Sequence, residues 1–170
     1  MKCPNCGSDV GEGYYFCKYC GAKLGEATVQ VQAGQPAETE VKATIIRRLD
    51  ALKNRDENAV RTLVDEKYSK FDDWPPYVRQ DAAEALRNEF GAFKVLSNYS
   101  YEIRDLTVEV FGDAALATFH IHYHGEMRNR RFDMVSRVTS VLRKREVGWG
   151  LVHEHFSRFP QERRRGFFGW

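Results

Sequence analysis

Residues 148–157 read GWGLVHEHFS, and this stretch decides how the C-terminal half of the chain folds. After Gly148 the residues alternate with a period of two, which predicts a β-strand over residues 149–158. Alternation places Trp149, His153 and His155 on one face of that strand and turns Glu154 to the other. Glu154 is therefore not expected to partner the two histidines.

The residues before this strand predict its pairing. Residues 146–148 fit a three-residue hairpin loop with Gly148 in the left-handed conformation, which places Arg145 opposite Trp149. A two-residue loop would shift every pair by one residue and exchange the two faces of the strand. The preferred register pairs His153 with Val141, His155 with Thr139 and Ser157 with Arg137.

Upstream of the hairpin the pattern predicts three helices followed by four strands. The helices are expected around residues 41–52, around residues 57–68 with Asp56 as N-cap, and over residues 78–93. The helical faces are Val41, Ile45, Ile46, Leu49 and Leu52; Val60, Leu63, Val64 and Tyr68; and Ala82, Ala85, Leu86 and Phe90. The strands are expected at residues 99–111, 114–124, 131–145 and 149–158, with a bulge at Arg104-Asp105 and a turn at Gly112-Asp113. This order predicts an α+β domain in which helices pack on one curved antiparallel sheet.

All four cysteines lie in the first twenty residues, in the pattern C-x2-C-x10-C-x2-C. Four thiolates in two close pairs can surround one zinc ion tetrahedrally, and a glycine after each pair allows the tight turn this requires. The spacing therefore predicts a zinc ribbon over residues 1–24, with one structural zinc per chain that leaves no open coordination position. Two disulfides are the alternative, which the spacing and a reducing compartment disfavour. The predicted zinc ligands are Cys3, Cys6, Cys17 and Cys20.

Composition limits the remaining possibilities. The 170 residues are 42% apolar and carry a net charge of +2, which is enough apolar surface for a core and too little charge to imply a nucleic-acid partner. No apolar run is long enough for a membrane span and no secretory signal precedes Cys3, so we expect a cytoplasmic protein. Residues 25–39 are small and polar and predict a flexible linker to a domain over residues 40–159. Residues 160–170 form a basic and aromatic tail that either packs on the domain or contacts acidic headgroups or phosphates.

Four fragments carry a resemblance to a known family. They are FDDWPPY, GDAALATF, RVTSV and GWGLVHEHFSRF, and in this order they look like the SnoaL-like branch of the NTF2-like superfamily. The resemblance implies a cone-shaped domain with a pocket between the helices and the concave face of the sheet. It does not imply a reaction, because the superfamily includes isomerases, dehydratases and non-enzymatic association domains.

The resemblance and the strand alternation together predict a pocket. Its expected lining is Trp74, Tyr77, Arg137, Thr139, Trp149, His153, His155 and Ser157. If the pocket is catalytic, His153 or His155 would transfer the proton with Asp72 or Asp73 as partner, and Arg137 would stabilise negative charge. We favour the alternative, in which these polar residues only shape an otherwise apolar cavity.

A second histidine group, His120, His122 and His124, is expected on the other side of the sheet from His153. Same-face neighbours on one strand are about 6–7 Å apart, so exposed histidines or a dimer interface are favoured over a shared metal ion.

Two main functions remain open. The first is a small-molecule-binding or protein-association domain that forms a homodimer and uses the ribbon as a docking element for a protein partner. The second is a lyase- or isomerase-type enzyme, and a nucleic-acid binder is possible but not favoured.

Overall fold

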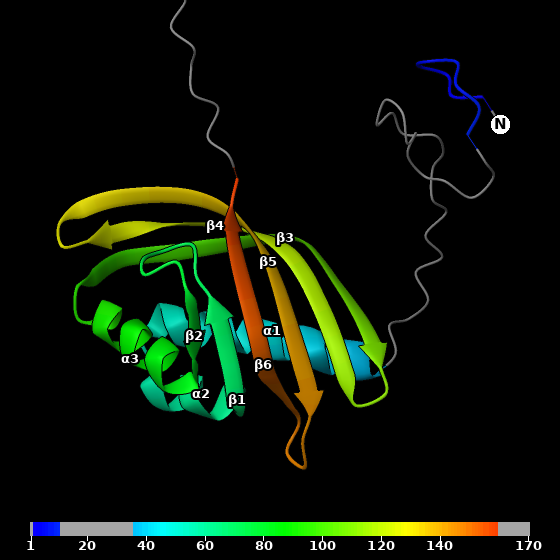
Figure 1. Ribbon diagram of the computed structural model, residues 1–170. Helices are drawn as coiled ribbons and strands as arrows, with labels where there is room; N and C mark the ends of the chain where they lie inside the picture. Colours follow the sequence, from blue (N-terminus) through cyan, green and yellow to red (C-terminus); the bar gives the residue numbers. More distant parts are fainter. Residues whose placement is uncertain (1, 11–35, 160–170) are drawn as a thin grey trace, which may run out of the picture. The chain divides into compact units, whose positions relative to one another are not determined.

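The computed structural model describes residues 2–10 and 36–159 of the chain (Figure 1). The chain divides into two compact units, Met1–Ala33 and Gly34–Trp170. Cys17, Cys20, the expected linker up to residue 35 and the tail from residue 160 lie outside the described residues.

The described part of the first unit is a tight turn that carries two of the predicted zinc ligands. Cys3 is buried and Cys6 is exposed. The Gly7 amide donates to the Cys3 carbonyl at 2.9 Å, and Gly7 has a φ of 69°, which favours glycine. An isolated antiparallel β-bridge between Lys2 and Asp9 joins the two ends of the turn. The expectation that glycine after a cysteine pair allows a tight turn is met at Gly7.

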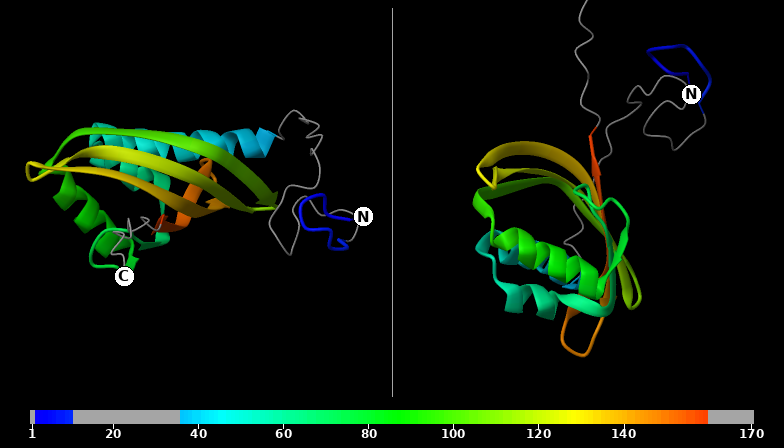
Figure 2. Two further views of the ribbon diagram at one scale, coloured as in Figure 1. Left: turned by 90° about the horizontal axis from the view of Figure 1, so that it is seen from above. Right: turned by 60° about the vertical axis from the view of Figure 1, so that its left-hand side comes forward.

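The second unit is an α+β domain, as predicted. Its elements are α1 (Pro36–Asn54), α2 (Glu57–Leu63), β1 (Val64–Phe71), β2 (Arg79–Asp81), α3 (Ala82–Phe93), β3 (Leu96–Phe111), β4 (Ala114–Met127), β5 (Arg130–Lys144) and β6 (Trp149–Arg158). The six strands form one sheet in the order β2-β1-β6-β5-β4-β3. In Figure 1 α1 runs behind β5 and β6, and Figure 2 shows the sheet curving around the helices.

The sheet differs from the prediction in two strands. It is mixed rather than antiparallel, because β1 pairs with β6 in parallel and with β2 antiparallel. Asp56 caps α2 as expected, with the Ala59 amide donating to its carboxylate at 2.9 Å, but the helix stops at Leu63. Val64 and Tyr68 therefore lie on a strand, where a spacing of four also places two residues on one face.

Two helix starts also differ. Helix α1 begins at Pro36, so residues 36–39 are helical and not part of a linker, consistent with the preference of proline for the first helical turn. Helix α3 begins at Ala82 and not at Val78, because Asp81 and Glu84 form a reciprocal capping box. Residues 79–81 instead pair with β1.

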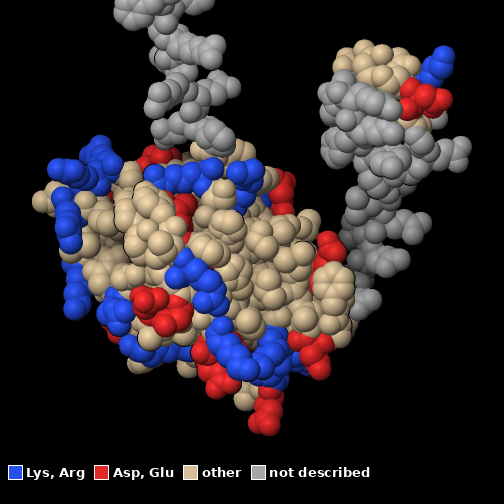
Figure 3. All heavy atoms as spheres, viewed as in Figure 1, with Lys and Arg blue, Asp and Glu red and all other residues tan. Residues whose placement is uncertain are grey.

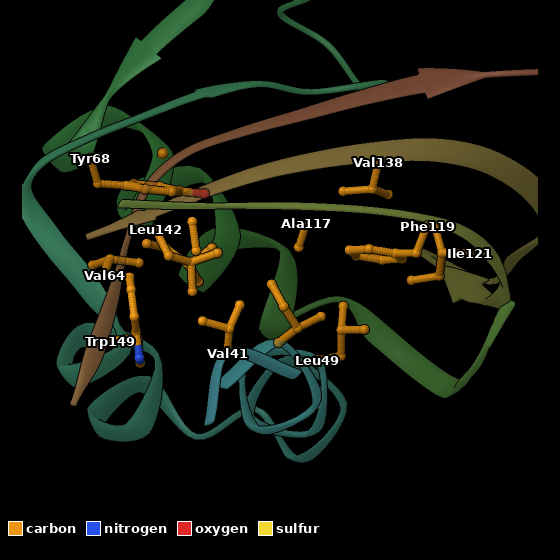
Figure 4. Packing of buried hydrophobic residues seen from close by; sticks show 14 of the residues in the cluster. Val41, Leu49, Val64, Tyr68, Ala117, Phe119, Ile121, Val138, Leu142 and Trp149 are labelled. Atoms are coloured by element: carbon orange, nitrogen blue, oxygen red, sulfur yellow. The ribbon is translucent and has the colours of Figure 1, made fainter. Parts of the chain in front are cut away.

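The core lies between α1 and the concave face of the sheet. Val41, Ile45 and Leu49 of α1 are at most 2% exposed. In Figure 4 the side chains of Val41 and Leu49 approach the strand residues from the helix side. The strand residues in this cluster include Ala115, Ala117, Phe119, Ile121, Tyr123, Leu142 and Trp149. The predicted apolar face of residues 114–124 is thus confirmed as the core face.

Strand β6 contains a β-bulge that changes its facing. Leu142 pairs with Leu151, but the adjacent Val141 pairs with His153, so Val152 is an extra residue on β6. Trp149 and Leu151 are buried before the bulge, and Glu154 is buried after it. A bulge of this kind interrupts strict alternation, so the residues on the core face change parity along one strand.

The predicted hairpin register is correct for the residue pairs beyond the bulge and wrong for the pair next to the loop. The pairs His153–Val141, His155–Thr139 and Ser157–Arg137 are confirmed. The pair Arg145–Trp149 is wrong, because Trp149 pairs with Lys144 and the bulge restores the expected register further on. The predicted positive φ of Gly148, 67°, and the bulge near Asp105 are both present.

Candidate ligand-binding cavity

A cavity of about 380 Å³ lies in the second unit between the helices and the concave face of the sheet. Its size falls in the usual range for sites that hold a small molecule. Its wall is formed by α1, α3, all six strands of the sheet and the loop after β1.

Most of the wall is apolar and aromatic. The Trp74 and Phe132 rings meet edge to face with centroids 5.4 Å apart, and Phe132 also lies 6.1 Å from Tyr123. Leu49, Leu52, Leu96, Ile121 and Met127 supply aliphatic surface. The aromatic residues of the wall are Trp74, Phe93, Tyr99, Tyr123, Phe132 and Phe156.

One side of the wall is polar. It consists of Lys70, Asp72, Asp73, Gln80, Asn88 and Glu89. The Lys70 ammonium lies 2.9 Å from Glu89 Oε1 and 2.8 Å from Asp72 Oδ2, and 4.8 Å from the centre of the Phe156 ring. Burial alone would lower the pKa of Lys70, but the carboxylates of Asp72 and Glu89 raise it well above its ordinary value. Lys70 is therefore a permanent cation at the cavity wall.

A buried ion cluster stands behind this polar side. Arg48 of α1 donates from Nη2 to Glu89 Oε1 at 2.6 Å and to Glu154 Oε2 at 3.2 Å. The Tyr68 hydroxyl donates to the same Glu154 oxygen at 2.6 Å. Burial would raise the pKa of Glu89, but Arg48 and Lys70 lower it to about 2. The cluster therefore keeps Glu89 ionised beside the cavity.

Asp73 has a separate set of partners. The Tyr123 hydroxyl donates to Asp73 Oδ2 at 2.6 Å, and the Ser136 hydroxyl donates to the same oxygen. Burial raises the pKa of Asp73 and the neighbouring Asp72 carboxylate adds to the rise, although both hydroxyl donors oppose it. Asp73 is thus a carboxyl group at the cavity wall that titrates at higher pH than an ordinary aspartate.

The predicted pocket residues are mostly elsewhere. Trp74 lines the cavity, but Tyr77 is 60% exposed and Trp149 belongs to the core. The side chains of Arg137, Thr139, His153, His155 and Ser157 lie on the opposite face of the sheet and do not line this cavity. The physical reason is the extra residue Val152, which reverses the faces that uniform alternation predicts.

All five histidines of the chain lie on that outer face, which is turned away from α1. Leu116 pairs with Val141, which pairs with His153, so the histidines of β4 and β6 belong to the same face. The prediction that the two groups lie on opposite sides is therefore wrong. Ser69 Oγ lies 2.9 Å from His153 Nδ1, and His122 Nε2 lies 2.7 Å from Asp133 Oδ1. Burial, His155 and Arg79 lower the pKa of His153, which keeps it neutral at neutral pH.

Sequence reasoning missed the ion cluster, although two of its members carried a signal. Arg48 and Glu89 lie on the apolar stripes of their helices, seven residues after Val41 and four residues after Ala85. A charge on an apolar stripe indicates a buried and paired group. For Glu154 the sequence pattern was misleading, because uniform alternation without the bulge places this residue on the face away from the predicted pocket.

Two observations concern metals and membranes. Across residues 2–10 and 36–159, no group of three or more His, Cys, Asp or Glu side chains is arranged to hold a metal ion. Cys3 and Cys6 are described there, whereas their expected co-ligands Cys17 and Cys20 are not. Among the same residues, no helix combines the length and apolarity needed to span a bilayer.

Comparison with known proteins identifies both units. A family model for the SnoaL-like domain matches residues 41–162, and one for a zinc-ribbon domain matches residues 2–24. The second unit thus has the α+β architecture of NTF2-like proteins, with helices on a curved sheet around a cavity. The chain belongs to the SnoaL-like family and carries an N-terminal zinc-ribbon domain. A search of curated protein sequences gave no match.

Solved structures agree on the fold. A Streptomyces avermitilis protein described as a "putative dehydratase from the NTF2-like family" has a TM-score of 0.67 at 18% identity, covering 72% of this chain and 96% of its own. The CaMKII hub of S. rosetta has a TM-score of 0.63 at 24% identity, covering 74% and 98%. A Shewanella frigidimarina protein described as a "putative ketosteroid isomerase" has a TM-score of 0.58 at 20% identity, covering 72% and 98%.

Proposed function

We propose that the SnoaL-like domain is a small-molecule-binding domain whose ligand occupies the cavity between α3, α1 and the concave face of the sheet. The observation that carries this proposal is the cavity of about 380 Å³ with an apolar wall and one polar side. Ligand sites usually combine a large apolar surface with a few polar groups that orient the ligand.

The proposal predicts that filling the cavity abolishes binding without unfolding the domain. Ala92→Trp and Leu96→Trp place a bulky side chain at the wall. Native mass spectrometry of protein purified under mild conditions should detect a bound small molecule in the unaltered protein and not in these variants. Asn58→Trp on α2 is the matched control, because Asn58 is exposed and does not line the cavity. Retention of the ligand by both cavity variants would place the site elsewhere.

A lyase- or isomerase-type reaction is the second candidate, and Asp73 is the observation that favours it. Its carboxyl group lines the cavity, and its pKa is raised chiefly by burial. A carboxyl group with a raised pKa suits proton transfer near neutral pH. This candidate uses Asp73 and not His153, His155 or Arg137, whose side chains lie on the outer face. Asp73→Asn should abolish turnover while ligand binding persists.

We propose that the ribbon binds one structural zinc through Cys3, Cys6, Cys17 and Cys20 and serves as a docking element for a protein partner. The match of the zinc-ribbon family model and the Cys3–Gly7 turn support this proposal. The turn carries two of the four proposed thiolate donors, and thiolates are the donors that structural zinc sites use. A cytoplasmic location is part of the proposal, because reduced thiols are required.

We also propose that the domain forms homodimers through the outer face of its sheet. In Figure 3 a broad area of this face carries no Lys, Arg, Asp or Glu, and the charges gather around it. Cross-strand rows such as His155–Thr139–Thr118–Thr107 supply short or uncharged side chains. Depletion of charge at the centre of a face is typical of protein interfaces.

A further inference from the structure

We propose that the cavity selects organic cations, namely small molecules that join one ammonium group to an aromatic or aliphatic body. This inference rests on the proposed binding function and specifies the ligand class. Three features of the cavity wall support it: an excess of acidic side chains, carboxyl oxygens that can accept further hydrogen bonds, and aromatic rings that line the same cavity.

The wall has an excess of negative charge. Among the described residues that line it, Lys70 is the one cation, whereas Asp72, Asp73 and Glu89 are carboxyl groups. The nearby Arg48 does not reverse this balance, because the Glu154 carboxyl group lies 3.2 Å from its guanidinium. Arg158 is exposed and stacks over Trp74 at 5.3 Å from the ring centre. A buried excess of negative charge is costly unless a cation neutralises it.

One carboxylate oxygen in this wall has an open hydrogen-bonding capacity. Glu89 is 8% exposed, and its Oε1 accepts from both Arg48 and Lys70. Its Oε2 is buried and has no hydrogen-bond partner among the described residues. An unsatisfied buried oxygen costs free energy, and its uncompensated negative potential favours a cation in the neighbouring cavity.

The Asp72 and Asp73 carboxyl groups provide the second acceptor site. Both line the cavity, and Asp72 raises the pKa of Asp73 after the larger effect of burial. Both protein donors to Asp73, Tyr123 and Ser136, bind the same oxygen, Oδ2. An ammonium group beside this pair would relieve the repulsion between two adjacent carboxylates.

The aromatic wall fits the rest of such a ligand. Trp74, Tyr99, Tyr123 and Phe132 line the same cavity as Asp73, the Trp74 and Tyr123 rings both contact Phe132, and the Tyr123 hydroxyl donates a hydrogen bond to Asp73. Aromatic faces attract organic cations and also bury apolar carbon. A carboxylate ligand would be repelled by the acidic side chains and would find no unpaired cation, because Lys70 is already paired with Asp72 and Glu89.

A matched probe series tests the inference. The probes are 2-phenylethylammonium, 2-phenylethanol and 3-phenylpropanoate, which share an aromatic body and differ in head group. Isothermal titration calorimetry at neutral pH should show that the ammonium probe binds most tightly of the three. Its affinity should exceed that of the alcohol by about tenfold or more, which corresponds to the free energy of one charge-assisted hydrogen bond. Asp72→Asn and Asp73→Asn should each reduce that preference severalfold. Glu66→Gln, an exposed change on β1, should leave it unchanged.

The outcomes separate this inference from the function on which it rests. Equal binding of the alcohol, or tighter binding of the carboxylate, would overturn the selectivity for cations and leave a ligand-binding cavity. An ammonium preference that survives both aspartate variants would also overturn it, because the cation would then lie elsewhere. Binding of none of the three probes, in a protein that also retains no molecule in native mass spectrometry, would count against the binding function itself.

Discussion

Arg48 on α1 and Glu154 on β6 form a buried ion pair, with Nη2 and Oε2 3.2 Å apart. The two residues are 1% and 2% exposed, and 106 positions in the chain separate them. Arg48 Nη2 also donates to Glu89 and the Tyr68 hydroxyl donates to Glu154, so the pair connects the helix layer to the sheet beside the cavity. The stability of the fold and the electrostatics of the cavity therefore depend on the same side chains.

Glu154→Ala should destabilise the domain by about 3–5 kcal/mol, because it leaves the Arg48 guanidinium buried with one carboxylate fewer. Glu66→Ala on β1 is the matched control and should change the free energy of unfolding by no more than about 0.5 kcal/mol, since Glu66 is exposed. Urea denaturation monitored by circular dichroism measures both. Equal values for the two variants would contradict a stabilising role for the ion cluster.

Acid should unfold the domain through Glu89. The pKa of Glu89 is about 2 in the folded chain against an ordinary value of 4.5, so the unfolded chain binds this proton first as the pH falls. The contribution is fully present above pH 4.5 and is lost between pH 4.5 and about 2, to a total of about 3 kcal/mol. Denaturation curves across this range should show a shallower pH dependence for Glu89→Gln. An identical slope in both proteins would refute the assignment.

Two glycine-to-alanine changes should have opposite signs. At Gly125 on β4 an added Cβ would lie 3.1 Å from the Ser97 carbonyl oxygen and 3.2 Å from the Tyr99 Cα, backbone atoms that cannot rotate away. Gly125→Ala should therefore cost about 1–3 kcal/mol. At Gly91 in α3 an added Cβ meets nothing within 4 Å, so Gly91→Ala should stabilise by about 0.5–1 kcal/mol through helix propensity. Thermal melting distinguishes the two, and a stabilising Gly125→Ala would disprove the tight approach of β3.

The purified protein should contain one zinc ion per chain by elemental analysis. Cys17→Ser should lose the zinc, because three thiolates and a hydroxyl group make a much weaker site. Ser8→Ala is the control, since Ser8 lies beside Cys6 without being a predicted ligand. A wild-type protein without zinc, or a Cys17→Ser variant with full zinc content, would end the proposal of a four-cysteine site.

Thr118→Arg should convert the proposed dimer to a monomer. Thr118 is exposed on the outer face of β4 and pairs with Thr139 and Thr107 on the neighbouring strands, so an arginine there adds a charge to the centre of the face. Asn58→Arg on α2 adds the same charge away from the sheet. Sedimentation velocity should give a dimer for the wild type and for Asn58→Arg. A Thr118→Arg dimer would move the interface to another surface.

The elements that the sequence predicts correctly are those set by local periodicity and capping. The four strands after residue 96, the N-cap at Asp56 and the core face of β4 all follow from spacing and turn chemistry. The parallel pairing of β1 with β6 does not, because it joins residues far apart in the sequence. Val64 and Tyr68 satisfy both a helical and a strand period, so their strand depends on tertiary pairing.

The candidate site was harder to predict than the fold. Residues 72–74, which the family resemblance implies near the mouth of the pocket, line the cavity of the structure. Uniform alternation assigns His153 and His155 to the pocket, whereas the extra residue Val152 turns both to the outer face of the sheet. A bulge depends on how two strands fit against the sheet and has no signature in the alternating pattern of residues 149–158. Arg48 and Glu89 could have been found, because buried charges on apolar helix stripes imply a partner.

Val152 is the residue that β6 has in excess of its partner β5, so removing it would leave Leu151 and His153 as neighbours opposite Leu142 and Val141. Alternation would then be uniform along the strand, with Glu154 still on the core face and both imidazoles still on the outer face. The bulge thus absorbs one added residue without exchanging the two faces of the sheet beyond it. The buried ion cluster is in this way insulated from a change of one residue in the length of β6.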